Sequence, residues 1–301
     1  MSLQLRLLNF LLPLIEKRYL SNMPSVDHAR ERFIRMAPRN FKTPPGVYFR
    51  DDTLCHEGHS VPVIVAEPGP VPARTALLYL HGGGYFMGSA ETHKRLAGTI
   101  AQAAGLRAYV ADFRLTPEHP FPAALEDAVA AYRAMEMMGI TRIVIAGDSA
   151  GGGLALALLH VICTTGMTQP AATVALSPWA DLTLKSPSLD RNRDSDVMLP
   201  RTGMEELVAT YRGETPADDP RISPVMGDFT GAGPVLIQAS QVEMLIDEAE
   251  AVIARMAEQG VDATLQTKSR TPHVWQLFHG FLPEADQAIA SIAVFLRRHL
   301  A

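Results

Sequence analysis

The chain has 301 residues, of which 47% are hydrophobic, enough for one large α/β domain or two small ones. Its formal net charge is −5, its pI is near 6.1 and no basic block stands out, which argues against nucleic acid as a partner. The two cysteines, Cys55 and Cys163, have neither metal-ligand spacing nor the pattern of a disulfide framework. We therefore expect structural thiols in a reducing cytoplasm.

The N-terminal 45 residues begin with an apolar cluster formed by Leu7, Leu8, Phe10, Leu11, Leu12, Leu14 and Ile15. Pro13 interrupts the cluster and Glu16-Lys17-Arg18 follows it, so it matches neither a signal peptide nor an integral membrane span. The pattern predicts an amphipathic helix. Such a helix either packs on the domain or binds a membrane surface or a partner.

Apolar runs and helical periodicity alternate along most of the remaining chain. Two early runs, Val47–Arg50 and Val61–Ala66, predict a leading hairpin. Later strands are expected at Ala76–Leu80, Leu106–Ala111, Ile143–Ala146, Thr173–Leu176, Val235–Ala239 and Val261–Thr267, and helices near 93–104, 122–138, 150–165, 246–259 and 283–300. This order predicts an α/β fold, with a mostly parallel sheet covered by helices on both faces.

One later segment, residues 183–218, breaks the alternation as the first 45 residues do. It is rich in Asp, Arg, Ser and Pro and contains a single helical stretch around Met204–Tyr211. An insertion between sheet strands, beside their C-terminal edges, is where a lid or cap belongs.

The pentapeptide Gly147-Asp148-Ser149-Ala150-Gly151 predicts a nucleophile elbow. It lies between an apolar run that predicts a buried strand and a stretch that predicts a helix. A sharp strand-to-helix turn strains the backbone of its central residue and exposes the hydroxyl. Glycines on both sides relieve the crowding that β-carbons would cause. The sequence thus predicts Ser149 as a nucleophile.

A glycine-rich turn, His81-Gly82-Gly83-Gly84, follows the strand at Ala76–Leu80. Backbone N–H groups in such a turn can approach a substrate closely and stabilise the oxyanion of acyl transfer, each donor contributing about 3–4 kcal/mol. A dinucleotide site would need a third glycine where Met87 stands, and a phosphate-binding lysine is also missing. We therefore predict an oxyanion hole.

A serine nucleophile needs a histidine base, which in this fold follows the serine in the chain. Four histidines do so. His160 falls inside the helix after the elbow and His299 ends the last helix, so both are expected to pack or lie at the surface. His273 lies in a loop after the strand Val261–Thr267, and we favour it over His279, which is nearer the last helix.

The carboxylate that orients the histidine should follow the strand Val235–Ala239. Glu243, Asp247 and Glu248 qualify by position. Asp247 and Glu248 fall in the first turn of the next helix, where the helix dipole favours negative charge in any case. Glu243 lies in the loop itself, so we favour Glu243 over Asp247.

These motifs resemble the hormone-sensitive-lipase-like, bacterial family IV esterases of the α/β-hydrolase superfamily. The resemblance covers about residues 55–300. Its motifs are His81-Gly82-Gly83-Gly84-Tyr85, Gly147-Asp148-Ser149-Ala150-Gly151-Gly152, the block from Asp112 to Ala124, Ser177-Pro178-Trp179-Ala180-Asp181-Leu182 and Asp219-Pro220-Arg221-Ile222-Ser223-Pro224.

The resemblance also bears on the acid and the base. The family's acid segment usually reads D-P-L-x-D-E, and alignment with Glu243–Glu248 places glutamate where most members have aspartate. The family's histidine is often followed by Gly-Phe, as His279 is here. However, Pro272-His273-Val274-Trp275-Gln276 resembles one branch of the family, and its distance from Glu243 is family-like.

Further roles are implied by the resemblance alone. Gly83, Gly84 and Ala150 would supply oxyanion N–H groups, with Gly82 shaping the turn. Residues 46–182 and 219–301 would form the catalytic domain, and residues 1–45 and 183–218 a helical cap over the pocket. Tyr85, Phe86, Trp179 and Met198 are expected pocket linings, and Arg114, Glu118 and Asp148 are expected to brace the motif loops. Members often pair through an edge strand, which is compatible with a homodimer.

We therefore predict a cytoplasmic serine carboxylesterase that hydrolyses short- to medium-chain acyl esters, or lactones, through an acyl-enzyme. The substrate would be a small molecule, and the chemistry needs no metal or organic cofactor. Two alternatives stay open: amide or peptide hydrolysis by the same residues, and a ligand-binding protein on the same fold that has lost catalysis.

Overall fold

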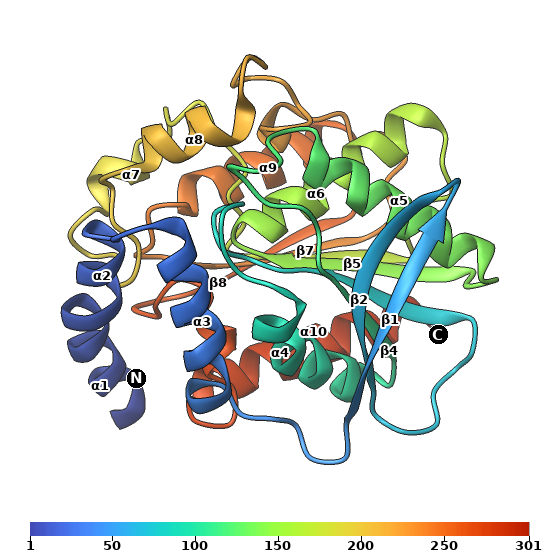
Figure 1. Ribbon diagram of the computed structural model, residues 1–301, viewed down its shortest axis with the longest axis horizontal. Coiled ribbons are helices and arrows are strands. Elements are labelled where there is room, and N and C mark those ends of the chain that lie inside the picture. Colours follow the sequence, from blue (N-terminus) through green and yellow to red (C-terminus); the bar gives the residue numbers. More distant parts are fainter. Residues whose placement is uncertain (301) are drawn as a thin grey trace.

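A single eight-stranded sheet organises the molecule. The computed structural model describes residues 1–300 (Figure 1). The strands lie in the order β1-β2-β4-β3-β5-β6-β7-β8. Their bounds are Tyr48–His56 (β1), His59–Glu67 (β2), Thr75–Leu80 (β3), Arg107–Ala111 (β4), Arg142–Asp148 (β5), Ala172–Leu176 (β6), Val235–Ser240 (β7) and Ala263–Lys268 (β8). Strand β2 runs antiparallel to both β1 and β4, and all other neighbouring strands are parallel, so the predicted mostly parallel α/β sheet is confirmed.

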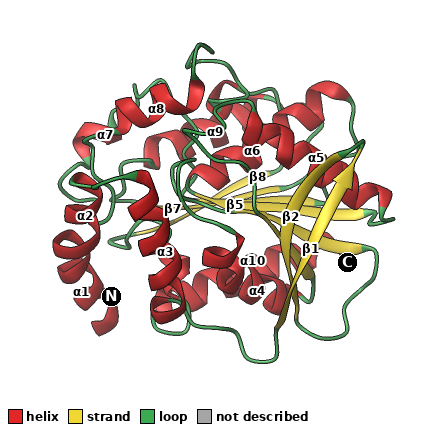
Figure 2. Cartoon of the chain, viewed as in Figure 1, coloured by secondary structure: helices red, strands yellow, loops and turns green. Residues whose placement is uncertain are grey.

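Helices cover both faces of the sheet (Figures 1 and 2). On one face lie α4 (Ala90–Ala104) and α10 (Pro283–Leu300); on the other lie α5 (Ala123–Met137), α6 (Ala150–Thr165) and α9 (Ile246–Glu258). The hairpin strands β1 and β2 are longer than their apolar runs predict, because several of their side chains are exposed and polar residues are tolerated there.

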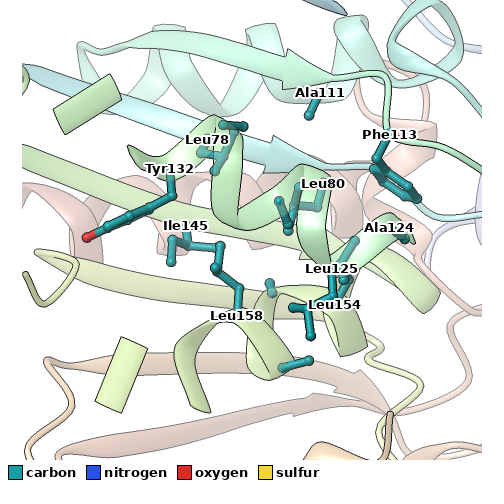
Figure 3. Packing of buried hydrophobic residues seen from close by; sticks show 14 of the residues in the cluster. Leu78, Leu80, Ala111, Phe113, Ala124, Leu125, Tyr132, Ile145, Leu154 and Leu158 are labelled. Carbon is teal, nitrogen blue, oxygen red and sulfur yellow. The ribbon is translucent and has the colours of Figure 1, made fainter. Parts of the chain in front are cut away.

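The core has two main layers because successive strand side chains point to opposite faces of the sheet. Leu78, Leu80 and Ile145 pack toward Leu154 and Leu158 of α6 (Figure 3). The alternate strand residues, such as Leu77 and Val144, belong to the cluster that includes α4 and α10. This double coverage explains why the central strands are continuously apolar in the sequence.

Residues 1–45 and 183–218, which do not follow the alternation of strands and helices, lie side by side at one end of the sheet (Figure 1). The first contains α1 (Leu3–Leu12), a π-helical turn (Pro13–Lys17), α2 (Arg18–Ser21) and α3 (Val26–Asn40), and the second contains α7 (Ser188–Arg191) and α8 (Met204–Arg212). Lys17 Nζ joins them by donating to the carbonyl oxygens of Arg193 and Asp196 at 2.5 and 2.6 Å. None of the described helices combines the length and apolar character that a bilayer crossing requires.

Candidate active site

Ser149 occupies the sharp turn between β5 and α6. Its φ of 52° and ψ of −123° are a strained backbone conformation for a residue with a side chain. A β-carbon at Gly147 would lie 2.2 Å from the Gly151 carbonyl oxygen, and one at Gly151 would lie 2.2 Å from the Leu80 carbonyl oxygen. The two glycines are therefore required by the close approach of the chain segments at this elbow.

The structure brings Ser149, His273 and Glu243 together from three separate loops. His273 Nε2 lies 2.9 Å from Ser149 Oγ, and His273 Nδ1 lies 2.8 Å from Glu243 Oε2. The other carboxylate oxygen of Glu243 accepts the Ser240 N–H at 3.0 Å, which fixes the side chain. Glu243 follows β7 and His273 follows β8, as the sequence predicts, so parallel strand ends deliver both groups to one edge of the sheet.

The pKa of His273 lies above its ordinary value. Burial acts to lower this pKa, but the hydrogen bond and the charge of Glu243 outweigh burial and raise it. The Glu243 carboxylate therefore favours the protonated form of the ring.

The other candidate groups have different partners. Asp247 accepts the Ser188 N–H at 2.8 Å and pairs with Arg191, whereas Glu248 accepts the N–H groups of Ala180 and Asp181 and has a pKa raised well above its usual value by burial. Neither touches His273 in the described part of the chain.

The remaining histidines are likewise held elsewhere. His279 Nδ1 lies 3.4 Å from Thr99 Oγ1, and burial lowers the pKa of His279 to about 4. His160 Nδ1 accepts the Asp228 N–H at 2.9 Å, and His299 contacts the ring of Phe295.

The glycine-rich turn after β3 presents backbone N–H groups beside Ser149. Within residues 1–300, the N–H groups of Gly83, Gly84 and Ala150 have no protein acceptor. Gly83 has a φ of +125°, and a β-carbon there would lie 2.2 Å from the Met87 carbonyl oxygen. Gly82 differs, because its N–H already donates to Asp148 Oδ1 at 3.1 Å. Gly82 therefore contributes to the shape of the turn.

A buried polar cluster of Asp148, Tyr79 and His93 supports this glycine turn. Asp148 Oδ1 also accepts the Tyr79 hydroxyl at 2.8 Å, while Oδ2 lies 3.4 Å from His93 Nε2. Burial acts to raise the pKa of Asp148, but the histidines and Tyr79 outweigh it and the net direction is down. Burial and the neighbouring His93 lower the pKa of His81 to about 4. The cluster therefore keeps an ionised acceptor beneath the turn.

A cavity of about 640 Å³ opens over Ser149. Phe86, Trp179 and Met198 line it, as expected. Other lining residues include Leu20, Met23 and Val26 from residues 1–45, and Leu199 and Leu207 from residues 183–218. Tyr85 is absent from the lining, contrary to expectation, because its ring stacks on Tyr211 with centroids 3.8 Å apart. The lining is dominated by apolar side chains, as is usual for small-molecule sites.

The expected bracing residues act in three places. Asp148 holds the glycine turn, as described above. Arg114 pairs with Asp127 and also donates to the carbonyl oxygen of Ala123, within the Asp112–Ala124 block. Glu118 pairs with Arg30 of α3, and Arg30 also donates to the carbonyl oxygens of Phe86 and Thr116.

Two supports of the Glu243 loop were missed by the sequence analysis. Asp196 accepts the Met244 N–H at 3.0 Å, and the Asn192 side chain donates to the Glu243 carbonyl oxygen at 2.9 Å. These partners are about 50 residues apart in the chain, and no local pattern connects them. Among the residues described, no group of three His, Cys, Asp or Glu side chains is arranged to hold a metal ion.

Known proteins resemble this chain in sequence and in fold. A family model described as alpha/beta hydrolase fold matches residues 77–277. An acetyl-hydrolase of Streptomyces hygroscopicus is 38% identical over 273 residues, covering 90% of this chain and 87% of the relative. An esterase of Acinetobacter venetianus is 32% identical over 226 residues, covering 74% and 75%.

Among solved structures, an esterase from the bacterial hormone-sensitive lipase family superposes with a TM-score of 0.91 at 36% identity, covering 100% of this chain and 99% of that one. The esterase EstE5, in a crystal soaked with p-nitrophenyl butyrate, superposes with a TM-score of 0.91 at 34% identity, covering 99% of both chains.

Proposed function

The chain belongs to the hormone-sensitive-lipase-like carboxylic ester hydrolases of the α/β-hydrolase fold, and on that premise we propose that it hydrolyses short- to medium-chain acyl esters through a triad of Ser149, His273 and Glu243. One observation carries the proposal. A continuous path of two hydrogen-bond distances, 2.9 and 2.8 Å, runs from Ser149 Oγ through the ring of His273 to Glu243.

The first half-reaction forms an acyl-enzyme. His273 Nε2 takes the proton of Ser149 as the hydroxyl oxygen attacks the ester carbonyl, and Glu243 stabilises the resulting imidazolium. The N–H groups of Gly83, Gly84 and Ala150 donate to the oxyanion that develops on the carbonyl oxygen. The imidazolium then protonates the departing alcohol, leaving the acyl group on Ser149.

The second half-reaction repeats these steps with water. His273 removes a proton from water, which attacks the acyl carbonyl, and the imidazolium returns that proton to Ser149 Oγ as the carboxylic acid leaves. The same oxyanion donors serve both steps, because both pass through a tetrahedral intermediate at the same carbon.

We also propose that residues 1–45 and 183–218 form a cap over the acyl and alcohol subsites. Both segments contribute side chains to the cavity, and Lys17 bonds one segment to the other. The volume of about 640 Å³ and the apolar lining suit an acyl chain of short or medium length.

Hydrolysis of a chromogenic butyrate ester, compared with the matching anilide, tests the proposal. We expect ester turnover in the native protein and its loss in Ser149→Ala. Equal or faster anilide cleavage would indicate an amidase, and absence of both activities in folded native protein would indicate a ligand-binding protein.

A further inference from the structure

Helix α1 presents an apolar stripe to solvent. Leu3, Leu7, Phe10 and Leu14 are 79%, 49%, 68% and 57% exposed, and their spacing places them on one side of the helix. Of the thirteen large hydrophobic residues that are exposed among those described, six lie within the first 15 residues. Scattered exposed apolar residues are ordinary in proteins, but a continuous stripe of this kind marks an interaction surface.

The opposite side of the same helix is firmly attached to the body of the protein. Leu5 is buried in a cluster with Trp275 and Leu282. The Ser2 hydroxyl and N–H both donate to Glu284, and the Asn9 side chain donates to the Arg270 carbonyl oxygen. The exposed stripe is therefore held in a fixed orientation.

Positive charge accompanies the stripe. Residues 1–45 contain eight Lys or Arg and three Asp or Glu, a net charge of +5, while the remaining chain carries −10. Arg6 is one turn from both Leu3 and Phe10, and Arg18 is one turn from Leu14. Both arginines are exposed, as are Arg35, Arg39 and Lys42, and none of these five has an ion-pair partner within residues 1–300.

The stripe is also connected along the chain to the wall of the cavity. The chain passes from α1 through α2 into residues 20–26, several of which line the cavity over Ser149. A surface bound by α1 would thus be separated by a short chain segment from residues that line the cavity over Ser149.

We propose that the outer face of α1, the π-helical turn after it and the start of α2, defined by Leu3, Arg6, Leu7, Phe10, Leu14 and Arg18, docks on an anionic lipid surface. The apolar side chains would enter the acyl boundary while the arginines contact negatively charged headgroups. A second copy of this chain fits less well, because a two-fold contact would place the same positively charged face against itself. The proposal concerns binding and holds whether or not the protein hydrolyses esters.

Vesicle co-sedimentation tests the proposal with the full chain. The probe is a vesicle of equal parts phosphatidylcholine and phosphatidylglycerol, compared with one of phosphatidylcholine alone. We expect binding to the anionic vesicle, and a bound fraction reduced about tenfold in the double variant Phe10→Ser with Leu14→Ser. The matched control, Met137→Ser with Met138→Ser, removes two exposed apolar side chains from the end of α5 and should bind as the native protein does.

A second variant, Arg6→Glu with Arg18→Glu, changes only exposed charges and should also weaken binding, as should added salt. All variants should retain native hydrolysis of a soluble butyrate ester, a readout that is separate from vesicle binding. Absence of binding to anionic vesicles, or equal binding by the Phe10/Leu14 variant and its control, would overturn the proposal. So would a dimer in sedimentation equilibrium that only the Phe10/Leu14 variant dissociates.

Discussion

Two buried carboxylate–imidazole pairs lie near the elbow. The front pair is Glu243 with His273, which contacts Ser149, and the rear pair is Asp148 with His93, which supports the glycine turn. In front, Glu243 contacts Nδ1 of His273 at 2.8 Å, and the second ring nitrogen reaches Ser149 Oγ. Behind, Asp148 lies 3.4 Å from Nε2 of His93, and the second ring nitrogen of that histidine is 2.8 Å from Thr92 Oγ1. Both pairs are buried, and in both the imidazole contacts a carboxylate. They differ in the partner of the other ring nitrogen, which is the Ser149 hydroxyl for His273 and the Thr92 hydroxyl for His93.

The electrostatics of the two pairs also differ. In front, Glu243 holds the pKa of His273 above its usual value despite burial, which favours a transient imidazolium. Behind, the neighbouring histidines help keep the pKa of Asp148 low, so this carboxylate is a permanent acceptor for the Gly82 N–H. In the proposed mechanism the Glu243–His273 pair exchanges a proton, whereas the Asp148–His93 pair holds a backbone turn.

The largest expected effect comes from the front histidine. His273→Ala should lower kcat for a butyrate ester by about 10⁴- to 10⁶-fold, because Ser149 would lose its base. Stopped-time product assays at high enzyme concentration measure the residual rate, and circular dichroism checks the fold. Retention of more than about one hundredth of native kcat would remove His273 from the proposed triad.

Glu243→Gln should lower kcat by about 10⁴-fold, because an amide neither selects the required ring tautomer nor stabilises the imidazolium. Steady-state kinetics on the same ester provides the measurement. Asp247→Asn is the matched control, since Asp247 contacts Ser188 and Arg191 instead of His273. A larger loss in the control than in Glu243→Gln would transfer the role of the acid to Asp247.

Asp148→Asn should have a smaller effect, about a tenfold reduction of kcat with KM nearly unchanged. A neutral amide oxygen is a weaker acceptor than a carboxylate, so the glycine turn would be held less firmly. Separate determination of kcat and KM checks this expectation. A loss as large as that of Glu243→Gln would show that the rear pair is more than a support.

His279→Gln should change kcat less than about twofold, because that ring is buried beside Thr99 rather than Ser149 and its lowered pKa keeps it neutral at neutral pH. Kinetics on the butyrate ester and a thermal unfolding curve separate catalysis from stability. A collapse of activity in a variant that still unfolds cooperatively would contradict the choice between the two histidines.

The residues of the front pair can be predicted from the sequence, because a local motif identifies the elbow and the order of the strands identifies the loops that carry the acid and the base. The elbow follows from glycines that flank Ser149 between an apolar run and a helix. The loops after β7 and β8 necessarily meet at one edge of a parallel sheet, so the order of acid and base places Glu243 and His273 together.

The supporting contacts could not be predicted in the same way, because they join positions that are distant in the chain. Tyr85 adopts a φ of 64° and stacks on Tyr211, so its side chain leaves the cavity that its position suggests. His93 has no distinguishing neighbour in the sequence of the first turn of α4, and its contact with Asp148 at the end of β5 arises only in the folded chain. Asn192 and Asp196 contact the Glu243 loop because residues 183–218 fold back beside that loop, which no local sequence pattern predicts.

Covalent labelling of Ser149 by a small organophosphonate tests the proposed triad most directly. The labelling rate is measured across a pH series by intact and peptide mass spectrometry. Labelling needs the neutral imidazole of His273 to accept the serine proton, and the pKa of that ring is raised above 6.5. The rate should therefore fall as the pH drops through this raised pKa, with a single adduct on Ser149. Labelling at another residue, or a rate that does not change across this pH range, would contradict the account.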